Sequence, residues 1–162
     1  MPAAPTVEDP GGGRVVAMRL TSLHSYHFAS PPEAVWAAMG DVDRYRDWWP
    51  WLRRFDAEAL AAGDRWHCLV KPPLPYELAF TLTLRTVRAA EAIEVDVSGD
   101  VRGTAGLTLT PSGEGAEVRV RSELTPVSRL LTGVALVAWP VARFAHDWVI
   151  DTGARQFAHR AL

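Results

Sequence analysis

The sequence predicts an α+β protein in which a curved antiparallel sheet of about seven strands wraps around one long C-terminal helix. Three observations support this fold. Apolar and polar residues alternate in several runs through the middle of the chain, two short helical segments follow the first strand, and the apolar spacing becomes helical near the C-terminus. A sheet with one face in water must bury its other face, and this helix is the only large partner that remains.

The first strand is predicted over residues 15–28, where Met18, Leu20, Tyr26 and other even-numbered residues share one side. The two prolines that follow the strand favour the first turn of a short helix, which ends at Gly40. A second short helix is predicted before the next proline, because proline cannot continue a helix.

Further strands are predicted where apolar residues alternate with polar ones. The runs cover residues 65–70, 78–85, 93–98, 104–110 and 117–124. Each run is apolar on one side and polar on the other, which is typical of an antiparallel sheet with one face in water. The breaks between the last four runs are short enough for hairpin turns.

The last predicted element is a long helix, because apolar residues recur at helical spacing over residues 131–152. Arg143, Asp147 and Asp151 fall on the opposite side of this helix. Arg143 with Asp147, and Asp151 with Arg155, are spaced as ion pairs between successive turns, each worth a few tenths of a kcal/mol.

Composition limits the class of function. The 162 residues contain 17 Lys and Arg against 19 Asp and Glu, for a net charge of −2. A near-neutral chain without a basic stripe gives no indication of nucleic-acid binding. The single cysteine, Cys68, excludes an intrachain disulfide and a multi-cysteine metal site. We therefore expect no metal ion and no cofactor.

The chain is expected to form one domain over residues 14–162, after a disordered tail over residues 1–13 that is rich in Pro and Gly. The start of the chain lacks the pattern of a secretory signal. The longest apolar stretch, residues 130–142, is too short to span a bilayer. We therefore expect a cytoplasmic protein, either a monomer or a homodimer.

A curved sheet that grips a single helix cannot close its core everywhere with side chains, and small residues such as Ala142 and Ala145 on the helix widen any gap. The expected result is an apolar cavity, the usual form of a small-molecule site. The predicted lining residues share the apolar side of their element or stand at the expected mouth, and they are His24, Tyr26, Trp49, Trp66, Cys68, Tyr76, Phe80, Leu82, Val95, Leu107, Val141, Ala145, Trp148 and Thr152.

Five segments carry a family resemblance, and in order they read YHFASPPEAVW, DVDRYRDWWP, PLPYELAF, VSGDVRG and HDWVIDTGARQFA. Together they resemble the START/Bet v 1-like (SRPBCC) superfamily, and more narrowly its polyketide cyclase/dehydrase and lipid-transport branch. The resemblance covers Leu20 to Leu162. It implies a helix-grip fold with a deep hydrophobic cavity between the sheet and the C-terminal helix. It does not fix the activity, because the superfamily mixes lipid carriers, hormone receptors and aromatase/cyclases.

Three functions remain open. The first is binding of a hydrophobic molecule, lipid-like or polycyclic and aromatic, in the cavity. The second is an aromatase/cyclase-like enzyme that acts on a polyketide, with His24 as the base and Tyr26 or Tyr76 as the hydrogen-bond donor. The third is a protein-interaction module that uses the Trp-rich corner at residues 48–51.

One further pair, His146 and Asp147, has the residue types of a base and the carboxylate that orients it. Neighbouring residues on a helix point in different directions, so we expect these two side chains not to meet.

Overall fold

The computed structural model describes residues 19–127 and 139–162, with the side chains of residues 139–141 left aside. The elements follow the predicted order, and they are β1 (Leu20–Phe28), α1 (Pro32–Met39), the 3-10 helix η1 (Val42–Arg44), α2 (Tyr45–Trp48), β2 (Leu52–Asp56), β3 (Arg65–Val70), β4 (Leu78–Arg88), β5 (Ala92–Gly99), β6 (Val101–Ser112), β7 (Gly115–Pro126) and α4 (Trp139–Arg160). The parts of the predicted first strand and last helix that precede residues 19 and 139 lie outside the described residues.

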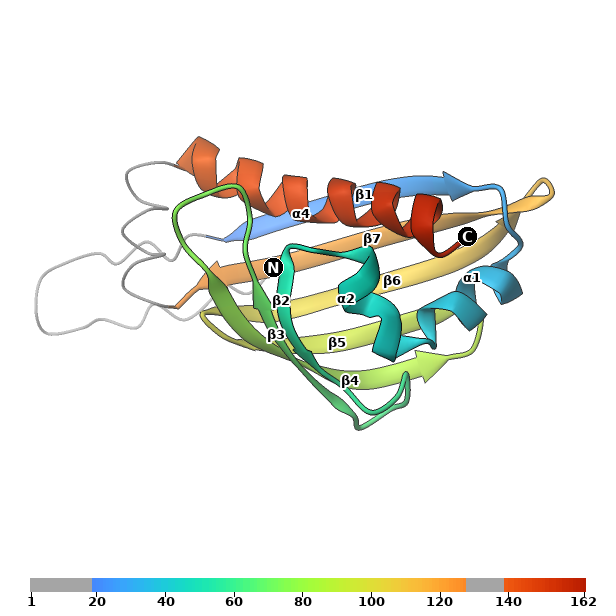
Figure 1. Ribbon diagram of the computed structural model, residues 1–162, viewed down its shortest axis with the longest axis horizontal. Coiled ribbons are helices and arrows are strands. Elements are labelled where there is room, and N and C mark those ends of the chain that lie inside the picture. The colour runs from blue at the N-terminus through green and yellow to red at the C-terminus, as the bar shows by residue number, and fades with distance from the viewer. Residues whose placement is uncertain (1–18, 128–138) are drawn as a thin grey trace, which may run out of the picture.

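The predicted fold class is confirmed. The seven strands form one antiparallel sheet in the order β1-β7-β6-β5-β4-β3-β2, so β1 and β2 are its edges. The sheet curves, and α4 runs alongside β1 on the same side as the short helices (Figure 1). The alternation runs did not reveal β2, which has five residues and only Leu52 buried.

The predicted parity of the first strand is also confirmed. Leu20, Ser22 and Phe28 are buried, whereas Leu23 is 69% exposed on the outer side. In the register of β1 with β7, Ser22 lies opposite Ser122. The inward side of these two strands therefore carries apolar residues together with Ser22, His24 and Tyr26 on β1 and Ser122 on β7.

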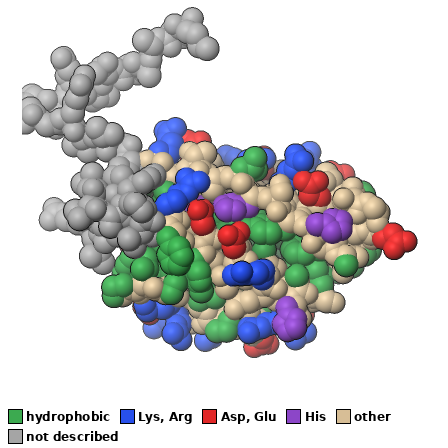
Figure 2. Space-filling view, turned by 90° about the horizontal axis from the view of Figure 1, so that it is seen from above, with side chains coloured by type: hydrophobic (Ala, Val, Ile, Leu, Met, Phe, Trp, Pro, Cys, Tyr) green, Lys and Arg blue, Asp and Glu red, His purple; other side chains and the backbone are tan. Residues whose placement is uncertain are grey.

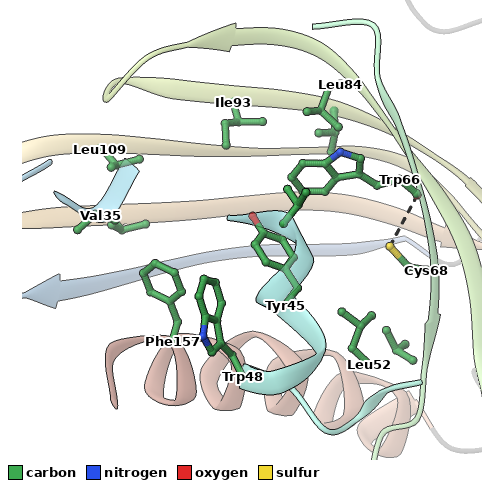
Figure 3. Packing of buried hydrophobic residues seen from close by; sticks show 14 of the residues in the cluster. Val35, Tyr45, Trp48, Leu52, Trp66, Cys68, Leu84, Ile93, Leu109 and Phe157 are labelled. Atoms are coloured by element: carbon green, nitrogen blue, oxygen red, sulfur yellow. Dashed lines mark hydrogen bonds between the residues drawn. The ribbon is translucent and has the colours of Figure 1, made fainter. Parts of the chain in front are cut away.

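An aromatic cluster packs the short helices between the sheet and α4. Tyr45 on α2 is stacked on Phe55 with 5.0 Å between ring centroids, and it meets Trp66 edge-on at 5.6 Å. Trp48 is only 2% exposed and packs edge-on against Phe157 of α4 at 5.5 Å (Figure 3). Aromatic pairs in these geometries add about 0.5–1.5 kcal/mol beyond the area they bury. The cluster thus ties α2, β2 and β3 to the end of α4.

Two strands approach unusually closely at Gly103 on β6. A Cβ atom added at this residue would lie 1.9 Å from the carbonyl oxygen of Glu123 on β7. No side chain fits at that distance, and the contact atom belongs to the backbone, which cannot turn away. Gly106, on the same strand, would meet only the flexible guanidinium of Arg121 at 3.2 Å.

Replacing Gly103 should therefore cost stability while replacing Gly106 should not. We expect Gly103→Ala to lower the free energy of unfolding by about 2–3 kcal/mol, because the backbones of β6 and β7 must separate. Gly106→Ala should change it by less than about 1 kcal/mol. Urea unfolding followed by circular dichroism measures both, and equal stabilities for the two variants would contradict the steric argument.

The buried thiol of Cys68 provides a second test. The side chain is 8% exposed, and burial raises the pKa of the thiol to about 12. The thiolate is the reactive form and appears only as the pH approaches that pKa, so at pH 8 the folded protein should react with iodoacetamide roughly 10³-fold more slowly than a free cysteine. Alkylation in urea should restore the ordinary rate. Fast alkylation of the folded protein would show that Cys68 is accessible.

Candidate functional site

Two adjoining cavities lie between the sheet and α4. Their volumes are about 260 Å³ and about 360 Å³. The first lies beneath residues 142–150 of α4 and the second beneath residues 149–157. Both are lined by Leu82, Val120, Val149 and Ile150, so these four apolar side chains form the boundary between them.

The first cavity has apolar walls with few polar groups. Its lining includes Pro72 and Tyr76, from the proline-rich connection between β3 and β4. Burial raises the pKa of the Tyr76 phenol, so this group stays neutral at physiological pH and can donate a hydrogen bond. The other polar groups in the wall are Ser122 on β7 and His146 on α4.

The second cavity has more aromatic residues in its lining than the first. Trp49 and Trp51 line it, and their indole N–H groups donate to the carbonyl oxygen of Gly153 and to Oε1 of Gln156, each at 2.9 Å. Because both indole donors are bonded to α4, the polar edges of the rings are satisfied. The two rings therefore present flat apolar surface to a molecule in the cavity.

The predicted lining residues divide into two groups. Those that line one or both cavities are Tyr26, Trp49, Tyr76, Phe80, Leu82, Leu107 and Ala145. Those that line neither of these two cavities are His24, Trp66, Cys68, Val95, Trp148 and Thr152. The side chain of Val141 lies outside what the structure describes.

Packing explains why four residues of the second group line neither cavity. Trp66, Cys68 and Val95 point to the inner side of the sheet as predicted, but they are buried in the hydrophobic core instead of bordering a hollow. Trp148 packs edge-on against Trp51, with 6.3 Å between ring centroids. Side-chain parity gives the side of the sheet that a residue faces, and does not say what fills the space there.

A short chain of polar groups forms the polar part of the first cavity. The hydroxyl oxygens of Ser22 and Ser122 are 2.8 Å apart, and Oγ of Ser122 is also 2.9 Å from Nε2 of His146. Ser122 is 7% exposed and the His146 side chain 12%, so this network is largely shielded from water.

Beside it lies a group that we call the His–Asp cluster, formed by His24, Tyr26, His146, Asp147 and Asp151. Oδ1 of Asp147 is 3.3 Å from Nδ1 of His146 and 3.3 Å from Nε2 of His24. Oδ1 of Asp151 accepts the Tyr26 hydroxyl at 2.5 Å and is 3.4 Å from Nδ1 of His24. Histidine and acidic side chains are visible together on this face of the molecule (Figure 2).

The surroundings of the His–Asp cluster shift the pKa values of three of its side chains. Burial lowers the pKa of His146 even though Asp147 opposes the shift. Burial alone would raise the pKa of Asp147, but the hydrogen bond from His146 and the charge of Arg143 outweigh it and hold the pKa below its usual value. Burial and the bond to Asp151 raise the pKa of Tyr26. At neutral pH the cavity thus faces a neutral imidazole with a carboxylate behind it.

Two expectations about α4 are wrong. His146 and Asp147 do meet: Nδ1 of His146 is 3.3 Å from Oδ1 of Asp147, which also lies 3.3 Å from Nε2 of His24 on β1. Asp151 does not pair with Arg155: its carboxylate binds Tyr26, and Arg155 donates to Oγ1 of Thr152 at 3.3 Å. The predicted pair of Arg143 with Asp147 is present at 3.4 Å.

Sequence reasoning missed Ser122, Asp147 and Asp151 as members of a polar site. For Ser122 a signal existed, because a serine stands between Val120 and Leu124 on the inward side of its strand. For Asp147 the neighbouring His146 was a signal, although the divergence of adjacent side chains on a helix argued against their contact. For Asp151 no such signal existed, since its meeting with β1 depends on how α4 lies against the sheet edge.

None of the helices in the described residues is long and apolar enough to cross a membrane.

Known structures share this fold at low sequence identity. TTHA0849 from Thermus thermophilus aligns with a TM-score of 0.72 and 11% identity over 88% of this chain and 97% of its own. Norcoclaurine synthase from Thalictrum flavum aligns with a TM-score of 0.59 and 12% identity over 90% and 95% of the two chains. The di-domain ARO/CYC StfQ from the steffimycin biosynthetic pathway aligns with a TM-score of 0.65 and 10% identity over 88% of this chain and 50% of its own.

No curated protein matches the chain in sequence. A family model does match, and it covers residues 7–161, nearly the whole length. The chain therefore belongs to the polyketide cyclase/dehydrase and lipid transport family.

Proposed function

We propose that this protein binds a hydrophobic small molecule, lipid-like or polycyclic and aromatic, in the two adjoining cavities beneath α4. The observation that carries the proposal is the pair of apolar hollows, of about 260 Å³ and about 360 Å³, which meet at four shared side chains. Ligand pockets commonly measure about 300–1,000 Å³, so together the two cavities fall in this range.

Apolar burial would supply the affinity. A ligand that hides about 300 Å² of apolar surface gains about 7 kcal/mol at ~25 cal/mol per Å², before the cost of ordering is subtracted. Tyr76 and Ser122 would orient such a ligand, because each has a hydroxyl group in an apolar wall, and His146 holds the Ser122 hydroxyl in place. The aromatic residues Trp49 and Trp51 favour a ligand that contains rings.

The family and the structural neighbours support a ligand-binding or cyclase role. Among the three functions left open by the sequence, the cavities favour the first. They also leave the second as a candidate, since a cyclase needs a shaped apolar cavity that brings carbon atoms into contact.

Filling the first cavity should block binding. Ala145 is 4% exposed and lines this cavity, so Ala145→Phe should weaken the binding of Nile red, a neutral hydrophobic dye, by about tenfold or more. Phe144, the neighbouring residue on α4, is 54% exposed, and Phe144→Ala should leave binding unchanged. Dye fluorescence measures affinity, and circular dichroism confirms that both variants are folded.

A molecule retained through purification gives a second test. Native mass spectrometry of freshly purified protein, followed by organic extraction, should reveal an apolar compound in the wild-type protein and less of it in Ala145→Phe. Equal dye binding by Ala145→Phe and wild type, with both folded, would exclude the first cavity as the binding site.

The cyclase candidate rests on Tyr76, a neutral phenol in the wall of an apolar cavity. Such a donor could stabilise the enolate oxygen that develops during aldol condensation of a poly-β-ketone. If the protein is a cyclase, Tyr76→Phe should lower kcat by about 10²-fold with little change in KM. Product analysis with a poly-β-ketone thioester measures this. A product distribution equal to that of the uncatalysed reaction for the wild type would eliminate the candidate.

A further inference from the structure

Two histidine nitrogens and a carboxylate oxygen lie close together where α4 packs beside β1. His24 extends from β1, and His146 and Asp147 extend from α4. One potential ligand atom from each residue lies within 4.8 Å of the other two. The three side chains are partly exposed, at 20%, 12% and 33%, so an ion from solution can reach them.

The separations also match those between two ligands of one metal ion. Oδ1 of Asp147 is 3.3 Å from Nε2 of His24 and 3.3 Å from Nδ1 of His146. Charge-assisted N–H···O bonds are shorter, about 2.7–2.9 Å. Two ligands of a tetrahedral zinc ion, each about 2.0–2.2 Å from the metal, are about 3.3–3.5 Å apart. Asp147 Oδ1 therefore has both imidazole nitrogens at the distance of co-ligands.

The remaining polar atoms of these residues have partners of the kind that orient metal ligands. Nε2 of His146 is 2.9 Å from Oγ of Ser122, and Nδ1 of His24 is 3.4 Å from Oδ1 of Asp151. The second carboxylate oxygen of Asp147 accepts from Nε of Arg143 at 3.4 Å. Metal-binding histidines almost always use their second nitrogen in this way, bonded to a carboxylate, carbonyl or water.

We propose that His24, His146 and Asp147 bind one divalent transition-metal ion, with zinc as the best match. Imidazole nitrogen and carboxylate oxygen are ligands that zinc accepts, and three protein ligands leave a fourth position for water or for an oxygen of a bound molecule. His146 also lines the first cavity, so the ion would lie at its wall. The site does not depend on the proposed hydrophobic ligand, because it forms from the protein alone.

The alternation and spacing of the sequence predicted no metal ion, and the topology explains why. The ligands come from opposite ends of the described chain, from β1 near its start and from the C-terminal helix α4, and they meet only through the packing of α4 on the sheet edge. A pair of adjacent ligands, His146 and Asp147, is uncommon on a helix because neighbouring side chains diverge.

Zinc binding to untagged, EDTA-treated protein tests the proposal. Competition with a chromogenic chelator should show one ion per chain for the wild type. His24→Ala and Asp147→Asn should each weaken binding by about 100-fold or more. His27→Ala is the matched control, since His27 is exposed on the other side of β1, and it should bind like the wild type.

A variant-independent measurement keeps the test decisive if a substitution unfolds the protein. On addition of zinc to the wild type, the NMR signals of the imidazoles of His24 and His146 should shift, while those of His27, His67 and His159 should not.

Asp151→Asn, which changes only an outer contact, should weaken binding by about tenfold or more. No stoichiometric binding, or shifts spread over all five histidines, would overturn the proposal.

Discussion

The structure depends on one geometric constraint: a seven-stranded sheet curves around a single long helix, and their side chains leave two cavities between them. The sheet must bury an apolar face, but α4 presents small side chains such as Ala142 and Ala145 toward it. At one end of the sheet the aromatic cluster around Tyr45 fills the gap. Beneath α4 the two cavities remain, and the second of them borders this cluster at Tyr45 and Phe157.

The same arrangement explains where polar chemistry collects. β1 is an edge strand, and α4 runs alongside it, so acids on the flank of the helix meet this strand before they reach water. Asp147 and Asp151 therefore contact His24 and Tyr26, which alternate on the inward side of β1. Asp147 is 33% exposed, and the hydrogen bond from His146 together with the charge of Arg143 holds its pKa below the usual value, so it stays ionised.

Features that depend on nearby residues could be predicted from the sequence, whereas features that depend on long-range packing could not. Strand parity, hairpins and the helical stripe are set by neighbours within a few residues, so the fold and the inward side of Tyr26, Phe80 and Leu107 were predictable. The burial of Trp66 and Cys68 in the core, away from the two cavities, was not predictable, because it depends on where the aromatic cluster packs. The His–Asp cluster was not predictable either, since it needs the rotation of α4 relative to β1.

His146 connects the two proposals about this protein. Through Nε2 it bonds Ser122 and faces the first cavity, and through Nδ1 it meets Asp147 in the His–Asp cluster. An imidazole ring is rigid, so whatever fixes Nδ1 also fixes the direction of Nε2. A metal ion bound by the cluster would therefore fix the imidazole that holds the Ser122 hydroxyl in the wall of the first cavity. The solvent-facing cluster and the apolar interior are in this way coupled through one side chain.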